Sequence, residues 1–154
     1  MSKGMVLLAA GGTGGHLFPA FALAEELKRR EIEVELVTDE RAGHYGGDFP
    51  ARAMHRVPSA TVLGRSPAAI AKTGWTLTRG FVRARKLIKE RAPAVVVGFG
   101  GYPTFPPLLA ASFLRVPSIV HEQNAVMGRA NRVLARRVSA IAASYEGTSK
   151  LPPG

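Results

Sequence analysis

Short apolar runs and longer stretches of helical periodicity alternate along the chain, and this order predicts its fold. Apolar or alternating runs predict strands at residues 5–8, 33–38, 53–57, 94–98, 116–120 and 138–143. Apolar residues at helical spacing predict intervening helices at residues 17–30, 65–91 and 128–137, and one that ends at 114. Residues 94–98 are almost entirely apolar, as in a strand buried on both faces of a parallel sheet. The pattern predicts an α/β domain.

Two of these elements have a periodic pattern of their own. Residues 33–38 alternate Val34, Leu36 and Thr38 against Glu33, Glu35 and Val37, which predicts a strand. Residues 65–91 are interrupted by Pro67, Gly74 and Gly80, and at 100° per residue their core-facing stripe is Ile70, Leu77, Phe81, Ala84 and Ile88.

A glycine-rich sequence, AAGGTGGH at residues 9–16, joins the first predicted strand to the first helix. Its four glycines remove the Cβ atoms that would hold a ligand away from the backbone N–H groups of a helix N-terminus, so we expect a phosphate-binding corner. The spacing fits neither the dinucleotide pattern, whose third glycine position is Leu17, nor the P-loop. The alternative is a tight turn that needs glycine for its geometry alone.

Two further polar or glycine-rich segments follow later strands. Residues 98–104 (GFGGYPT) form a second glycine turn, which we expect to face the first across a crevice at the carboxyl ends of the strands. Residues 121–124 (HEQN) follow the strand at 116–120, at the rim where α/β proteins bind ligands. The cationic surroundings should keep Glu122 ionised and able to act as a base or accept a sugar hydroxyl. The alternative is that HEQN only holds loops together.

The positive charge is concentrated in the second two-thirds of the chain. The formal net charge is +10, and residues 49–154 hold sixteen Lys and Arg against three Glu. This favours nucleic acid, an anionic membrane or a phosphorylated ligand as partner. Trp75 and Val82 fall away from the core-facing stripe of residues 65–91, beside the cations Lys72, Arg79, Lys86 and Lys89. An indole among cations predicts an interfacial membrane anchor, and the alternative is a solvated face with one stray Trp.

Several site classes are disfavoured by what the sequence lacks. No run approaches the roughly 18 apolar residues of a membrane-spanning helix, and residues 1–3 lead directly into the first strand, so we expect no signal peptide. Cys is absent, which suits a cytosolic protein. His44 and His55 have no partner at metal-ligand spacing, and no Asp-x-Asp pair is present to hold Mg²⁺. We therefore expect no metal and no cofactor.

Three separated blocks, taken together, identify a resemblance. GGTGGHxxP at residues 11–19, GxGGYxxxP at 98–106, and HEQN at 121–124 followed by Gly128 and Asn131-Arg132 occur in the order of the MurG family. These bacterial transferases add N-acetylglucosamine to the lipid-linked muramyl-pentapeptide precursor of peptidoglycan. The resemblance runs from Met5 to about Ser144 and covers the N-terminal half of that family.

The resemblance implies the fold and the roles of the blocks. It implies the N-terminal domain of a two-domain (GT-B type) glycosyltransferase, a Rossmann-like parallel sheet with helices on both faces. Residues 1–150 would be this acceptor and membrane domain and 151–154 the start of a linker, with the donor domain absent. UDP-N-acetylglucosamine would contact Thr13, Gly14, Gly15 and Asn124. The acceptor and its diphosphate would contact Gly11, Gly12, Gly100, Gly101, Tyr102 and Asn131. The acceptor's 4-hydroxyl would attack with inversion, and His16 and Glu122 are the two candidates for its base.

The implied partners are UDP-N-acetylglucosamine, an undecaprenyl-diphosphate-linked muramoyl-pentapeptide, the missing donor domain and an anionic membrane. The implied location is peripheral, on the cytoplasmic face of the bacterial plasma membrane. We expect the chain alone to be inactive, because half of the closed cleft is absent. Alternatives are another lipid-directed UDP-sugar transferase or a membrane-recruiting subunit of a split enzyme. Nucleic acid is disfavoured as a partner, because the cationic segments lack interleaved aromatic residues.

Overall fold

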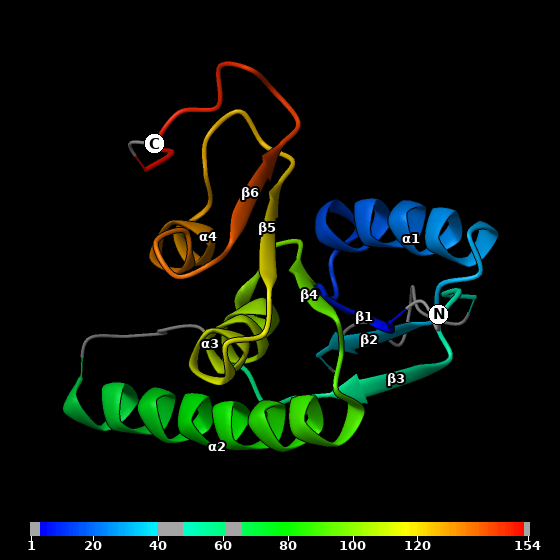
Figure 1. Ribbon diagram of the computed structural model, residues 1–154. Helices are drawn as coiled ribbons and strands as arrows, with labels where there is room; N and C mark the ends of the chain where they lie inside the picture. The colour runs from blue at the N-terminus through cyan, green and yellow to red at the C-terminus, as the bar shows by residue number, and fades with distance from the viewer. Residues whose placement is uncertain (1–3, 40–47, 61–65, 153–154) are drawn as a thin grey trace.

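The computed structural model describes residues 4–39, 48–60 and 66–152, which contain one six-stranded sheet (Figure 1). Its strands are β1 (Val6–Ala9), β2 (Val34–Thr38), β3 (Ala53–Arg56), β4 (Val95–Gly98), β5 (Ser118–Glu122) and β6 (Ala140–Ala143). All neighbours pair in parallel, in the order β3-β2-β1-β4-β5-β6, so the predicted parallel sheet is confirmed. His44, Arg65, Pro153, Gly154 and residues 41–47 of the predicted 41–50 loop lie outside the described residues.

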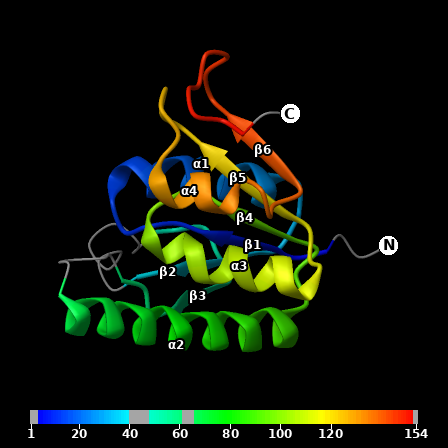
Figure 2. The same ribbon diagram turned by 90° about the vertical axis from the view of Figure 1, so that its left-hand side faces the viewer.

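Helices cover both faces of the sheet, as predicted (Figure 2). One face carries α1 (Gly14–Arg29), and the other carries α2 (Pro67–Arg91), α3 (Phe105–Leu114) and α4 (Arg129–Leu134). A short 3₁₀ turn, η2 (Tyr102–Thr104), leads into α3. Because successive strand residues point to opposite faces, Leu8 of β1 is buried in one cluster with Leu17 of α1, and Leu7 in another with Ile88 of α2.

The helix α2 is continuous from Pro67 to Arg91, so neither Gly74 nor Gly80 breaks it. Pro67 occupies the first turn, where its missing N–H costs nothing, and the Ser66 hydroxyl caps the helix by accepting from the Ala69 N–H at 3.2 Å. At Gly80, α2 passes close to the Pro58 carbonyl. A Cβ on this residue would lie 2.1 Å from the carbonyl oxygen, so only glycine fits there.

The core-facing stripe of α2 differs from the prediction at one end. Ala84 and Ile88 are buried and Leu77 and Phe81 are half-buried, as predicted, but Ile70 is exposed. The first turns of α2, which contain Ile70, extend past the start of α3 (Figures 1 and 2).

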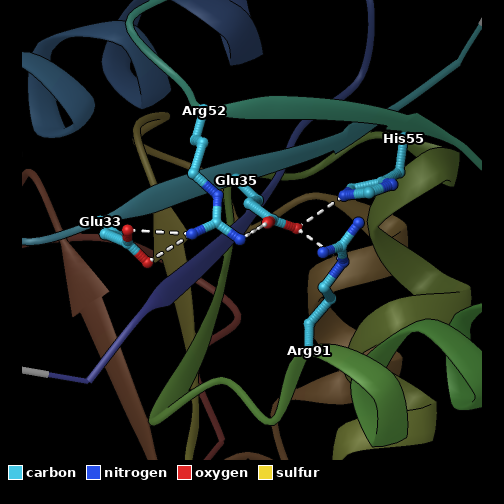
Figure 3. A network of polar contacts seen from close by, with 5 residues as sticks. All are labelled: Glu33, Glu35, Arg52, His55 and Arg91. Carbon is cyan, nitrogen blue, oxygen red and sulfur yellow. Dashed lines mark hydrogen bonds and ion pairs between the residues drawn. The ribbon is translucent and has the colours of Figure 1, made fainter.

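The predicted strand β2 is confirmed, and it is buried on both faces. Glu35 is fully buried and meets three cationic or ionisable side chains near the amino end of the strand (Figure 3). Its Oε2 lies 2.7 Å from His55 Nε2 and 3.5 Å from Arg91 Nε, and its Oε1 lies 3.3 Å from Arg52 Nη2. Arg52 also pairs with Glu33 at 2.9 Å. These contacts join β2 to β3 and to the last turn of α2, at the sheet edge opposite the predicted ligand rim.

Candidate functional site

The two glycine turns follow neighbouring strands, β1 and β4, and contact each other directly. The Gly11 N–H donates to the Gly100 carbonyl at 3.2 Å. A Cβ on Gly101 would lie 3.2 Å from the Gly11 Cα. Gly100 and Gly101 have φ values of +95° and +80°, which L side chains rarely adopt. The turns lie together at the carboxyl ends of the strands, as predicted, but they contact each other directly instead of facing each other across a crevice.

His16 lies in the first turn of α1, and its ring packs against the second glycine turn. The ring nitrogen Nδ1 lies 2.9 Å from the Phe99 carbonyl oxygen and 2.6 Å from the side-chain amide of Gln123. A Cβ on Gly100 would approach the ring Cε1 to 3.0 Å, so the glycine leaves room for the imidazole. The other nitrogen, Nε2, has no hydrogen-bond partner among the residues that the structure describes.

Glu122 is buried at the end of β5, and both of its carboxylate oxygens are fully engaged. Its Oε1 accepts from the Asn124 backbone N–H at 3.0 Å and from the Asn124 amide at 2.8 Å. Its Oε2 accepts from the Gly128 N–H at 2.9 Å and from the Asn131 amide at 2.8 Å. Burial alone would raise the pKa of Glu122, but these four N–H groups together hold the pKa below its usual value.

The ionised state predicted for Glu122 therefore follows from hydrogen bonds and not from surrounding cations. A carboxylate with four N–H donors and a lowered pKa is a weak proton acceptor. The geometry makes Glu122 an anchor for the loop after β5. Asn131, the anchor's partner on α4, is buried, and its Oδ1 has no hydrogen-bond partner within the described part of the chain.

A cavity of about 230 Å³ brings most of the predicted site residues together. Its lining combines α1, the second glycine turn, the end of β5 and the start of α4, and consists of His16, Gly100, Gly101, Tyr102, Glu122, Asn124, Gly128, Arg129, Ala130 and Asn131. Gly11 and Gly12 are buried behind it. The cavity opens to solvent at the carboxyl edge of the sheet, where α/β proteins bind ligands.

The remaining predicted site residues lie at the amino end of α1, outside this lining. Thr13 is the exposed N-cap, and its hydroxyl makes no capping hydrogen bond. Gly14 and Gly15 begin the helix, and their N–H groups have no intrahelical acceptor. Among the described residues, a Cβ on Gly15 would meet no atom within 4 Å, whereas one on Gly14 would lie 2.9 Å from the Phe18 ring. The positive end of the helix dipole favours an anion here.

The face of α2 predicted to point outward does so. Trp75 is 67% exposed and Val82 is 60% exposed. Lys72, Arg79 and Lys86 are also exposed.

Two groups that matter to the geometry escaped the sequence analysis. The sequence marks Gln123 only as one of four polar residues that follow a strand. Its contact with His16 could not be predicted, because the two residues are 107 positions apart in the chain. Phe113, at the end of α3, is 63% exposed, packs on Phe81 of α2 with ring centroids 5.6 Å apart, and lies 6.0 Å below the Arg137 guanidinium. The signal in the sequence that could have identified Phe113 was an aromatic residue near the end of an apolar helix.

None of the helices in residues 4–39, 48–60 and 66–152 combines the length and apolarity that a membrane crossing demands. Within the same residues, no three His, Cys, Asp or Glu side chains come close enough to one another to hold a metal ion.

Residues 6–143 match the glycosyltransferase family 28 N-terminal domain. The chain is 61% identical over 154 residues to a Rhizobium johnstonii protein named "UDP-N-acetylglucosamine--N-acetylmuramyl-(pentapeptide) pyrophosphoryl-undecaprenol N-acetylglucosamine transferase", with 99% of this chain and 41% of the relative covered. A protein of the same name from Agrobacterium fabrum is 58% identical over 153 residues, covering 99% of this chain and 39% of the relative. The chain thus spans about two fifths of the length of these curated relatives.

Solved structures with the same fold include transferases and epimerases. Acinetobacter baumannii MurG superimposes with a TM-score of 0.81 at 27% identity, over 98% of this chain and 43% of that one. The UDP-GlcNAc 2-epimerase of Neisseria meningitidis reaches a TM-score of 0.70 at 17% identity, over 96% of this chain and 42% of that one, and is similar in fold alone.

Proposed function

Because the chain belongs to the glycosyltransferase family 28 N-terminal domain family, we propose that it is the acceptor-binding portion of a peptidoglycan-precursor transferase. The donor is UDP-N-acetylglucosamine, and the acceptor is a lipid-linked muramoyl-pentapeptide, as the relatives' name states for those proteins. The observation that carries this proposal is the convergence of His16, the second glycine turn and the HEQN segment on one cavity, with the first glycine turn hydrogen-bonded to the second.

The proposed reaction is a single displacement at the anomeric carbon of N-acetylglucosamine. The acceptor's 4-hydroxyl oxygen forms the new bond to that carbon while the bond to the UDP oxygen breaks, so the configuration inverts and UDP leaves with the bonding electron pair. A base takes the hydroxyl proton as the bond forms.

Of the two candidate bases, the geometry favours His16. Its Nε2 is unpartnered among the described residues, whereas both oxygens of Glu122 already accept two N–H groups each. Glu122 instead holds Asn124 and Asn131 in place beside the cavity. Asn131 Oδ1, which is buried and unpartnered in the described chain, is an acceptor available to a substrate hydroxyl.

The diphosphate groups of donor and acceptor suit the glycine-rich edge of the sheet. The Gly11 N–H is bonded to Gly100, so Gly11 contributes by allowing close approach and not as a donor. The N–H groups of Gly14 and Gly15, at the positive end of α1, remain available to phosphate oxygens. On the side of the site that faces the donor-binding portion lie Thr13 and Asn124. The side that faces the acceptor is formed by Gly12, Gly100, Gly101 and Tyr102.

The acceptor's lipid implies a membrane, and α2 offers the surface for it. Exposed Trp75 and Val82 lie among Lys72, Arg79 and Lys86, an arrangement that places an indole at headgroup level and cations on anionic lipid. Phe113, which packs against α2, adds a second exposed aromatic ring beside a cation. This surface supports peripheral attachment to the cytoplasmic face of a bacterial plasma membrane.

The proposal is tested by joining residues 1–152 to the remaining portion of the Rhizobium johnstonii relative and assaying the purified chimera. We expect transfer of N-acetylglucosamine from its UDP derivative to a lipid-diphosphate muramoyl-pentapeptide. A His16→Ala chimera should lose about 10²–10⁴-fold in kcat, whereas His55→Ala, on the far edge of the sheet, serves as the matched control. A folded chimera that binds neither substrate would overturn the proposal, and full activity of His16→Ala would overturn the base assignment.

A further inference from the structure

The His16 imidazole has two neighbours at the same nitrogen. Nδ1 lies 2.9 Å from the Phe99 carbonyl oxygen, which can only accept a hydrogen bond, and 2.6 Å from Nε2 of Gln123, which can only donate. One ring nitrogen cannot donate to the first group and accept from the second at once. The Gln123 Oε1 is meanwhile buried without a hydrogen-bond partner among the described residues.

One arrangement removes the conflict at Nδ1. A half-turn of the Gln123 amide places Oε1 against Nδ1 and moves the NH₂ group to the position that Oε1 occupied. Nδ1 then carries the proton and shares it between two acceptors, the Phe99 carbonyl and Gln123 Oε1. The opposite choice, with Nδ1 unprotonated, sets its lone pair against the Phe99 carbonyl and leaves Gln123 Oε1 without a partner.

We propose that Gln123 is a positioning residue that holds the neutral His16 imidazole in its Nδ1–H form, with Nε2 as the proton acceptor in the cavity. A backbone carbonyl at Nδ1 orients many catalytic histidines, and the amide oxygen adds a second acceptor that stays in place when the ring becomes cationic. The tautomer itself is independent of the proposed function. Its consequence for the rate of transfer rests on that function.

Other titratable groups around the cavity do not set this tautomer. Tyr102 of η2, Glu122 of β5 and Arg129 of α4 line the same cavity. Glu122 is occupied by four N–H donors, and neither Tyr102 nor Arg129 makes a hydrogen bond to the ring within the described residues. Gln123 and Phe99 are therefore the groups that decide which nitrogen carries the proton.

The direct test is nitrogen-15 NMR of the imidazole rings in the 154-residue chain, with signals assigned by single His substitutions. We expect Nδ1 to be protonated and Nε2 unprotonated in neutral His16. Gln123→Met should lower that preference about two- to tenfold, the effect of one hydrogen bond. Gln123→Glu should raise the titration midpoint of His16 by about one pH unit or more, because a carboxylate then faces Nδ1–H. His55 is the internal control, since its titration should be the same in every variant.

The possible outcomes separate this inference from the proposed function. An Nε2–H tautomer in the unsubstituted chain, or an unchanged tautomer ratio in Gln123→Met with His55 unaffected, overturns the role of Gln123. If Gln123→Met does not fold, the titration of Gln123→Glu decides, and an unshifted His16 midpoint overturns the inference. In the chimera, Gln123→Met should lower kcat more than it changes KM and should alter the pH profile. A chimera that never transfers sugar refutes the proposed function and leaves the tautomer measurement intact.

Discussion

Replacing Glu122 with glutamine separates an anchoring carboxylate from a catalytic base. The substitution keeps the size of the side chain but exchanges one acceptor oxygen for an NH₂ donor. Each oxygen of Glu122 accepts two N–H groups, so the new NH₂ meets two donors wherever it lies and loses both hydrogen bonds. Rotation of the Asn131 amide would bring its unpartnered Oδ1 to the NH₂ and recover one of them.

The magnitude follows from the number of bonds lost. Hydrogen bonds to a charged group contribute about 1.5–3 kcal/mol each, so we expect Glu122→Gln to lower the free energy of unfolding by about 2–5 kcal/mol. This is a large fraction of the roughly 5–15 kcal/mol that stabilises a typical domain. The assay is urea denaturation of the 154-residue chain at neutral pH, followed by circular dichroism. Glu146→Gln, at an exposed carboxylate, is the matched control and should change stability by less than about 0.5 kcal/mol.

Acid should reduce the difference between the two proteins. The pKa of Glu122 is lowered in the folded state, so its stabilising contribution is complete above the unfolded value of 4.5 and is lost as the pH falls through the lower folded pKa. The stability of the unsubstituted chain should therefore converge on that of Glu122→Gln below pH 4.5. A Glu122→Gln protein with unchanged stability at neutral pH, whose chimera has lost transfer, would refute the anchor reasoning and restore Glu122 as the base.

Three other substitutions test separate features of the fold and surface. Gly80→Ala should lower the free energy of unfolding by about 1–3 kcal/mol, because its Cβ would clash with the Pro58 carbonyl. Gly74→Ala, at an open position of the same helix, should raise the free energy of unfolding by about 0.5–1 kcal/mol. Equal effects of the two substitutions in urea denaturation would contradict the packing at Gly80. Glu35→Ala should lower the free energy of unfolding by about 1–3 kcal/mol, and an unchanged urea midpoint would mean that the ion pairs contribute nothing. Trp75→Ser should weaken sedimentation with phosphatidylglycerol vesicles about tenfold at fixed salt, with an oligonucleotide as competitor; unchanged vesicle binding would remove α2 from the membrane surface.

The order of elements and the glycine-rich edge of the sheet were predictable because they depend on local pattern. Periodicity placed the strands within two or three residues, and glycine followed by a helix start indicated both turns. The rule that the carboxyl ends of parallel strands meet at one edge then predicted that the two glycine turns and the HEQN segment lie at that edge.

What the sequence did not predict depends on partners from distant elements. The burial of Glu35 is one example, because nothing local in the sequence reveals that Arg52, His55 and Arg91 converge on it. Ile70 reads as core because periodicity does not say where the neighbouring helix begins. Glu122 was correctly expected to be ionised, but its four N–H donors come from a loop and a helix whose path the sequence does not reveal.

The hydrogen bond from Gly11 to Gly100 has a consequence for the order of folding. Its two turns follow strands that are adjacent in the sheet but are separated by the whole of β2, β3 and α2 in the chain, and His16 contacts residues 83 and 107 positions away. Such non-local contacts form late and slowly. The site is therefore assembled only when β1 and β4 have paired. Hydrogen exchange at the Gly11 amide, which donates to the Gly100 carbonyl, reports how often the two halves of the sheet separate between β1 and β4.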